Sequence, residues 1–137
     1  MFYEATTKVT RINERGEEKQ VIERYVIQNC ETFREAEERA AKTYAEYNLD
    51  GDVVAIKRSN LYEIVNENAN KEKYFRAKLG SIFIDENSGK EKMTYYHVLL
   101  SADNMDEAQK IMKEYMNQGM NDFILLEIKE TKINDLI

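Results

Sequence analysis

The feature that most limits how this chain can fold is an internal duplication. When the sequence is aligned with itself at an offset of 72 residues, similar residue types coincide along almost the whole length. Val26-Ile27 falls on Val98-Leu99, and Ile56-Lys57 falls on Ile128-Lys129. Because similar residue types coincide in every predicted element, the sequence indicates two copies of one structural unit. We base the fold prediction on this repeat.

Each copy begins with a pattern typical of a β-hairpin. In the first copy, residues 2–12 and 19–28 are rich in Val, Ile, Thr and Tyr and flank a polar turn. In the second copy, residues 73–85 and 91–101 flank a turn that contains Gly89, which can adopt a positive φ at little cost. We therefore predict two antiparallel hairpins.

A helix and a third strand are predicted after each hairpin, the third strands at 52–58 and 122–130. Thr32 precedes Glu35 by three residues, as Asn104 precedes Glu107, which is the spacing of a capping box. We interpret both Glu residues as capping groups rather than catalytic ones. The apolar residues that recur at helical spacing are Phe33, Ala36, Ala40, Tyr44 and Tyr47 in the first helix and Met105, Ala108, Met112 and Met116 or Tyr115 in the second.

The predicted fold class is α+β, with two tandem ββαβ repeats. The repeats span residues 1–65 and 73–137, and residues 66–72 form a polar linker. In each repeat the helix is expected to cover one face of a mixed sheet. Because a repeat of this size has a small core, we expect the two to pack together with pseudo-twofold symmetry as one compact unit.

The residue counts exclude several classes of active site. With one Cys and one His, the chain can form neither an intramolecular disulfide nor a Cys/His zinc site by itself. Cys30 is interpreted as a packing residue, His97 as a strand histidine and Asp50-Gly51-Asp52 as a turn. The five glycines form no phosphate-binding loop. Because no nucleophile, base and orienting group can be named together, we expect no enzymatic activity, metal or cofactor.

The most suggestive surface segment is residues 71–92, which hold six Lys and Arg against four Asp and Glu in a chain of net charge −6. Aromatic residues are interleaved with the cations on the two predicted strands. Cations and aromatic rings on a strand surface can bind single-stranded nucleic acid or another anionic ligand. The candidate binding residues are Tyr74, Arg76, Lys78, Lys92 and Tyr95. The alternative is that the aromatic residues face the core and the lysines protect a sheet edge.

Two other functions remain open at this stage. The net charge of −6 and the acidic first helix, with Glu31, Glu35, Glu37 and Glu38, favour a protein–protein adaptor or an inhibitor of a host enzyme. A cleft between the repeats could instead hold a small nucleotide signal. The outer strands could also pair across a twofold axis and form a homodimer.

Four segments carry a resemblance to a known family. They are Phe2-Tyr3-Glu4, residues 56–64, residues 74–78 and the hydrophobic C-terminal tip. The chain resembles an uncharacterised domain family found in gut Bacteroidetes and in the tailed phages that infect them. The resemblance implies a small phage-associated protein and carries no catalytic signature. It also implies an aromatic C-terminal residue, whereas this chain ends in Asp135-Leu136-Ile137, which we interpret as a structural edge element.

The sequence contains no apolar run near the roughly 20 residues that span a bilayer. Its first residues also lack the basic and then apolar pattern of a signal peptide. We therefore expect a cytoplasmic protein that does not associate with a membrane, and the resemblance places it in the cytoplasm of a bacterial host.

Overall fold

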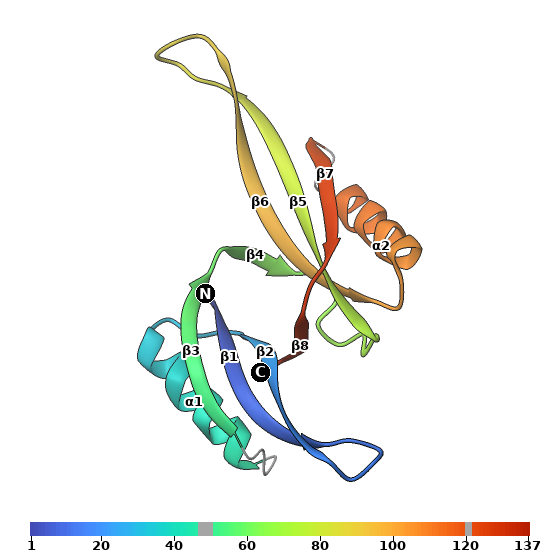
Figure 1. The fold of residues 1–137 in the computed structure, drawn as a ribbon. Helices are drawn as coiled ribbons and strands as arrows, with labels where there is room; N and C mark the ends of the chain where they lie inside the picture. The colour runs from blue at the N-terminus through green and yellow to red at the C-terminus, as the bar shows by residue number, and fades with distance from the viewer. Residues whose placement is uncertain (47–50, 120–121) are drawn as a thin grey trace. The chain divides into compact units, whose positions relative to one another are not determined.

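The structure is a computed structural model that describes residues 1–46, 51–119 and 122–137. Within these residues the chain forms eight strands and two helices (Figure 1), which confirms the α+β class. Tyr47, Asp50 and the turn residues Met120 and Asn121 lie outside the described residues. The elements are β1 (Phe2–Ile12), β2 (Glu18–Ile27), α1 (Phe33–Glu46), β3 (Gly51–Ser59), β4 (Leu61–Ile64), β5 (Lys73–Ile84), β6 (Glu91–Ala102), α2 (Met105–Asn117), β7 (Phe123–Glu130) and β8 (Ile133–Leu136).

The strands form two mixed sheets, as predicted, but each sheet has four strands where three were expected, because the short strands β4 and β8 join the hairpins and third strands. The first sheet has the order β3-β1-β2-β8 and the second β4-β6-β5-β7. Both β2 and β3 are antiparallel to β1, so they run parallel on either side of it, and α1 connects them. In the second sheet α2 connects β6 to β7 across β5 in the same way. The pseudo-twofold packing of the repeats stays a prediction.

The short last strand of each half pairs with the sheet of the other half. β4 lies parallel to β6, and the Val65 N–H donates to the Leu99 carbonyl at 2.8 Å. β8 lies parallel to β2, and the Ile137 N–H donates to the Val26 carbonyl at 2.8 Å. The C-terminal tip is therefore an edge strand.

These exchanged strands define the two compact units. The first unit comprises Met1–Asn60 and Lys132–Ile137, and the second comprises Leu61–Thr131. By contrast, residues 61–65 were expected in the first repeat and residues 133–137 in the second. Self-alignment of the sequence predicts that these segments are equivalent, but it does not predict which strand each one pairs with.

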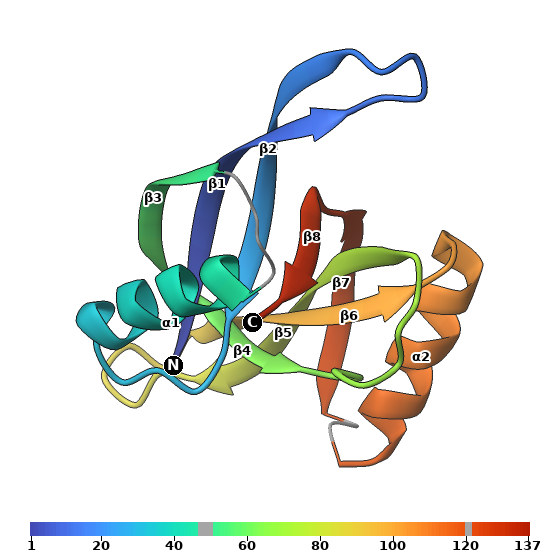
Figure 2. The same ribbon diagram turned by 90° about the horizontal axis from the view of Figure 1, so that it is seen from below.

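In the first unit, α1 packs on one face of the sheet (Figure 2). The small residues Ala36 and Ala40 let the helix approach closely, and Tyr44 completes its buried side. These three residues form one cluster with Tyr3, Ala5, Tyr25, Ile27 and Cys30. Cys30 is fully buried, which agrees with its interpretation as a packing residue.

In the second unit, Ala108 and Met112 of α2 pack against Phe75, Ala77, Leu79, Val98, Leu100 and Ala102. The inward residues of β6 are thus Val98 and Leu100, whereas those of β2 are Tyr25 and Ile27. The predicted match of Val26-Ile27 with Val98-Leu99 is wrong by one residue. Ile12 pairs with Glu18 but Ile84 pairs with Glu91, so the second hairpin turn is one residue longer. Such a shift exchanges the two faces of a strand.

The predicted helix caps are present in part. The Asn104 side chain accepts a hydrogen bond from the Glu107 N–H at 2.9 Å, and the Thr32 hydroxyl accepts one from the Glu35 N–H at 3.2 Å. The Glu35 carboxylate accepts a hydrogen bond from the Glu31 N–H at 3.1 Å, one residue before the donor that a capping box would use. The Glu107 carboxylate instead forms an ion pair with Lys71 at 3.1 Å.

Candidate functional site

Strand β5 presents a different set of residues on each side of the second sheet. Phe75, Ala77 and Leu79 are buried beneath α2. Tyr74, Arg76 and Lys78 alternate with them and therefore lie on the opposite side of the sheet. We call this side, which also carries Tyr95 and His97 of β6, the distal face.

On β6, Tyr96 and Val98 pack toward α2. Tyr95 and His97 alternate with them along the strand, so Tyr95 and His97 lie on the distal face beside Lys78. His97 is directly opposite Lys78 in the strand register. The Lys78 Nζ lies 4.3 Å from the centre of the Tyr95 ring, within the range of a cation–π interaction. Tyr95 is 52% exposed, whereas Leu99 on the same face is buried. The accessible part of the distal face is therefore the part around Tyr95.

His97 is the candidate site residue that sequence reasoning missed. Burial lowers its pKa, and the positive charges of Arg76 and Lys78 lower it further, while Glu127 acts in the opposite direction. The imidazole is therefore neutral at neutral pH and can donate or accept a hydrogen bond. The signal available in the sequence was its spacing of two residues from Tyr95, which places both side chains on one face of a strand.

The structure does not bring Lys92 to this group. Lys92 is three residues from Tyr95 and so points to the other side of β6. Its Nζ forms an ion pair with Asp85 at 2.7 Å. This contact and the hydrogen bond from the Asn87 N–H lower the pKa of Asp85. Lys92 thus stabilises the β5–β6 turn, and four of the five predicted binding residues share the distal face.

Apolar side chains border the distal face on its hairpin side. Gly80 lies opposite Tyr95, and a Cβ atom at Gly80 would come within 2.6 Å of the Met93 sulfur and 3.1 Å of Leu126 Cδ1. The missing side chain lets Met93 and Leu126 close over the strand. Ile82, in the same strand as Gly80, is 49% exposed, and Ile124, in the same strand as Leu126, is 44% exposed. The cations are therefore next to an apolar surface.

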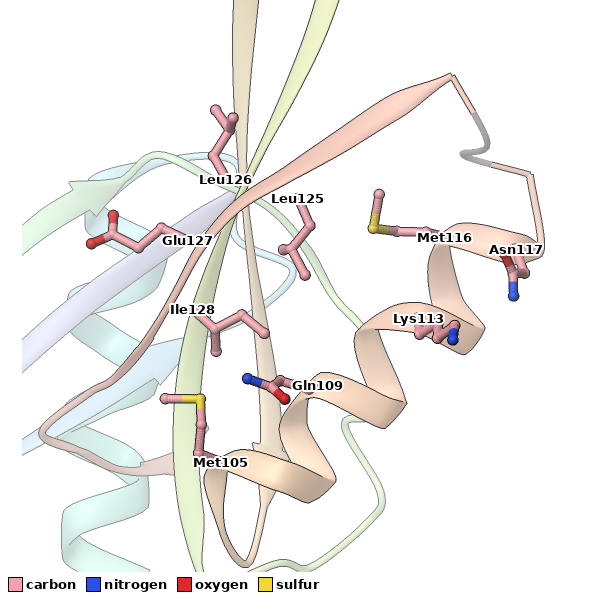
Figure 3. A pocket seen from close by; sticks show the side chains of 9 residues that line it. All are labelled: Met105, Gln109, Lys113, Met116, Asn117, Leu125, Leu126, Glu127 and Ile128. Carbon is pink, nitrogen blue, oxygen red and sulfur yellow. The ribbon is translucent and has the colours of Figure 1, made fainter.

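A second feature of this unit is a groove between α2 and the edge strand β7 (Figure 3). Its volume is about 650 Å³. Thioether and aliphatic side chains contribute most of its surface, and Figure 3 shows Met105 and Met116 extending from the helix toward β7. The lining residues are Met105, Gln109, Lys113, Met116, Asn117, Leu125, Leu126, Glu127 and Ile128.

Among the described residues, no group of three or more His, Cys, Asp and Glu side chains is placed to hold a metal ion. Within the same residues, no helix has the length and apolarity needed to cross a membrane. The Asp50 side chain of the predicted turn lies outside the described residues, and nothing of the Asp52 side chain is described.

Comparison with known proteins identifies a family. No curated protein and no solved structure matches the chain. A family model described as a domain of unknown function, DUF4494, matches residues 1–137. Because this match covers the whole length, the chain belongs to the DUF4494 family of domains of unknown function.

Proposed function

We propose that this protein is a non-enzymatic binding protein whose ligand is single-stranded nucleic acid, bound on the distal face of the second sheet. The observation that supports the proposal is the contact between the Lys78 ammonium and the half-exposed Tyr95 ring. Arg76 and His97 lie opposite or next to these residues on the same face. Cations beside an exposed ring are the combination with which single-strand binders contact phosphates and stack bases.

The acidic net charge favours a single strand over a duplex as the ligand. A chain of net charge −6 cannot rely on bulk positive charge, which dominates binding to the duplex backbone. A local group of cations with an aromatic ring is sufficient for a short single-stranded segment, because each stacked base contributes about 1–3 kcal/mol. Arg76 and Lys78 would meet phosphates, and Tyr95 would stack on a base.

We also propose a phage or prophage origin and action in the cytoplasm of the bacterial host. The resemblance of Phe2-Tyr3-Glu4 and residues 56–64 to a family of gut Bacteroidetes and their phages supports this. A host protein bound by the acidic surface of α1, or a small nucleotide, is the alternative ligand. Capture of a host protein that is lost at high salt would favour the adaptor over nucleic-acid binding.

The test is fluorescence anisotropy of a labelled single-stranded oligonucleotide, with the duplex of the same sequence in parallel. We expect saturable binding of the single strand that weakens as salt increases. Lys78→Ala and Tyr95→Ala should each weaken binding by about tenfold. Lys78→Ala should also reduce the salt dependence by about one phosphate contact.

Lys92→Ala is the matched control, because it removes the same charge from the other side of the sheet. It should leave the affinity within about twofold, as expected for the loss of a distant surface charge at physiological salt. An equal loss in the Lys78 and Lys92 variants would contradict a site on the distal face. Failure of either nucleic acid to bind would refute the proposal.

A further inference from the structure

The edge strand β7 of the second sheet has backbone N–H and C=O groups that point away from the sheet. It is the last strand in the order β4-β6-β5-β7, and no strand among the described residues pairs with its outer side. The Thr131 N–H donates to the Tyr74 carbonyl at 2.9 Å, so Tyr74 and Thr131 form a hydrogen-bonded pair. Because such pairs alternate along antiparallel strands, the backbone N–H and C=O groups of Ile128 and Glu130 point outward.

The charges along β7 complement those of a second, antiparallel copy of the same strand. If two β7 strands pair about a twofold axis at Ile128, Glu127 of each copy lies opposite Lys129 of the other. Ile128 then forms the hydrogen-bonded pair on the axis, which agrees with the outward direction of its backbone groups. By symmetry, two Glu127–Lys129 ion pairs therefore form between the two β7 strands.

The charges in the neighbouring strand favour the same arrangement. Lys129 lies opposite Arg76 in the register of β5 and β7, which places two cations side by side. Like charges at directly opposite positions are unfavourable. Within the chain, Lys129 has an ion pair with Glu127 at 3.2 Å, and both side chains are about half exposed or more. A second Glu127, from another copy, would lie directly beside Lys129 and offset the repulsion.

The other edge strands lack this self-complementarity. β4 carries one charged residue, Glu63, and β8 carries one, Asp135, so pairing of either strand with its own copy provides no opposite charge for these carboxylates. Over Val54–Ser59, β3 has Lys57 and Arg58 as its charged residues. Like charges on an edge strand are a common protection against pairing. Among the described edges, β7 is the one with alternating signs over this stretch.

The groove beside β7 provides apolar surface for the same contact. Ile128 and Leu125 line it from the strand, and Met105 and Met116 line it from the helix. Met105 is 37% exposed and Leu126 is 43% exposed. A strand added at β7 would cover this surface, and methionine side chains adapt readily to a partner.

We infer that the protein forms a homodimer through antiparallel pairing of two β7 strands, with Ile128 at the twofold axis and reciprocal Glu127–Lys129 ion pairs. This inference is independent of nucleic-acid binding, and it is tested without nucleic acid.

The experiment measures the mass of the full chain in solution over a concentration series, by light scattering after size-exclusion chromatography. The unmodified protein should show a concentration-dependent dimer. Lys129→Glu and Glu127→Lys should each convert two attractive pairs into repulsive ones and raise the dissociation constant roughly tenfold or more. Lys110→Glu makes the same charge change on an exposed part of α2 outside the groove and should leave the dimer intact.

Mixing the two reversed variants gives the sharpest result. A Lys129→Glu chain and a Glu127→Lys chain regain opposite charges at both positions, so an equimolar mixture should form a heterodimer while each variant alone does not. Circular dichroism of each variant checks that it is folded. A monomer at every concentration of the unmodified protein would overturn the inference, as would a dimer that survives Lys129→Glu or a mixture that does not associate.

Discussion

At the scale of single residues, a buried polar cluster links α1 to the β1–β2 hairpin. The Thr7 hydroxyl donates to the Tyr44 hydroxyl, and the Tyr25 hydroxyl donates to the Glu23 carboxylate. Glu23 also accepts hydrogen bonds from Arg11 at 2.7 and 2.9 Å. Burial, followed by the contact with Glu23, raises the pKa of Tyr25. The cluster thus satisfies polar groups beneath the hairpin, where apolar residues alone would leave Thr7 without a partner.

Tyr44→Phe should destabilise the first unit by about 1–2 kcal/mol, because it leaves the fully buried Thr7 hydroxyl without this partner. Adding Thr7→Val should recover part of the loss, since removing both partners costs less than removing one. Denaturant unfolding of the two single variants and the double variant provides the measurement. Additive losses would show that the hydroxyl pair contributes nothing to stability.

The pKa of His97 reports the charges of the distal face. Replacing Lys78 by Met should raise it, because a like charge is removed, and Glu127→Gln should lower it, because an opposite charge is removed. As the folded pKa is depressed, the contribution of His97 to stability is present above its unfolded pKa of about 6.5 and is lost as pH falls. Since the chain has one His, its imidazole resonances in an NMR titration are unambiguous. Shifts in the opposite directions would contradict the placement of these charges.

At the scale of elements, caps and alternation determine where strands and helices begin and which side they bury. The hairpin strands and the third strands formed within one or two residues of the predicted ranges, and both helices formed over the predicted apolar stripes as far as the described residues extend, because apolar periodicity and capping are local properties. Local patterns did not determine which side chains of β6 face the helix. That depended on one extra residue in the second turn, and the apparent match of Val26-Ile27 with Val98-Leu99 did not show this extra residue.

Asn104→Ala should destabilise α2 by about 1 kcal/mol, because the Glu107 N–H loses its acceptor. Asn104→Asp is the matched control and should retain the stability, since a carboxylate is an equally good cap and is favoured at a helix N-terminus. Amide exchange in the first turn of α2 and the midpoint of thermal unfolding measure the effect. Equal stability of all three chains would argue against the cap.

At the scale of the whole molecule, each sheet is completed by a strand from the other half of the chain. Deletion of residues 133–137 should therefore affect the first unit, although these residues follow the second unit in sequence. The Gln28 N–H donates to the Ile137 carbonyl at 3.1 Å, and the deletion removes this acceptor. It also removes the packing of Ile137 against the core around Tyr3. We expect faster amide exchange at Gln28 and lower stability of the first sheet.

The Val65 N–H, which bonds to Leu99 in the second sheet, is the internal control for this deletion and should exchange at its original rate. Faster exchange at Val65 with no change at Gln28 would contradict the assignment of β8 to the first sheet. Exchange measured by NMR on the full chain and the shortened chain separates these outcomes.

The sequence by itself determined the two hairpins, the two helices and the third strands in their order, but not the short strands β4 and β8. Its residue counts led us to expect no enzymatic activity. Periodicity, turn residues and caps act over a few neighbours, and the counts of Cys, His and Gly need no coordinates. It also placed Tyr74, Arg76 and Lys78 on one side of a strand, because alternation is a local rule.

Only the tertiary structure decided which strands pair and which side chains meet. The exchange of β4 and β8 and the pairing of Lys78 with His97 depend on register between distant strands. The position of Lys92 on the other side from Tyr95 follows from alternation along β6 alone, which the predicted binding set did not respect. Register is set by turn length and by burial of one face against a helix, both of which act over the whole sheet. The groove beside β7 exists for the same reason, since α2 and the edge strand meet only after the sheet has formed.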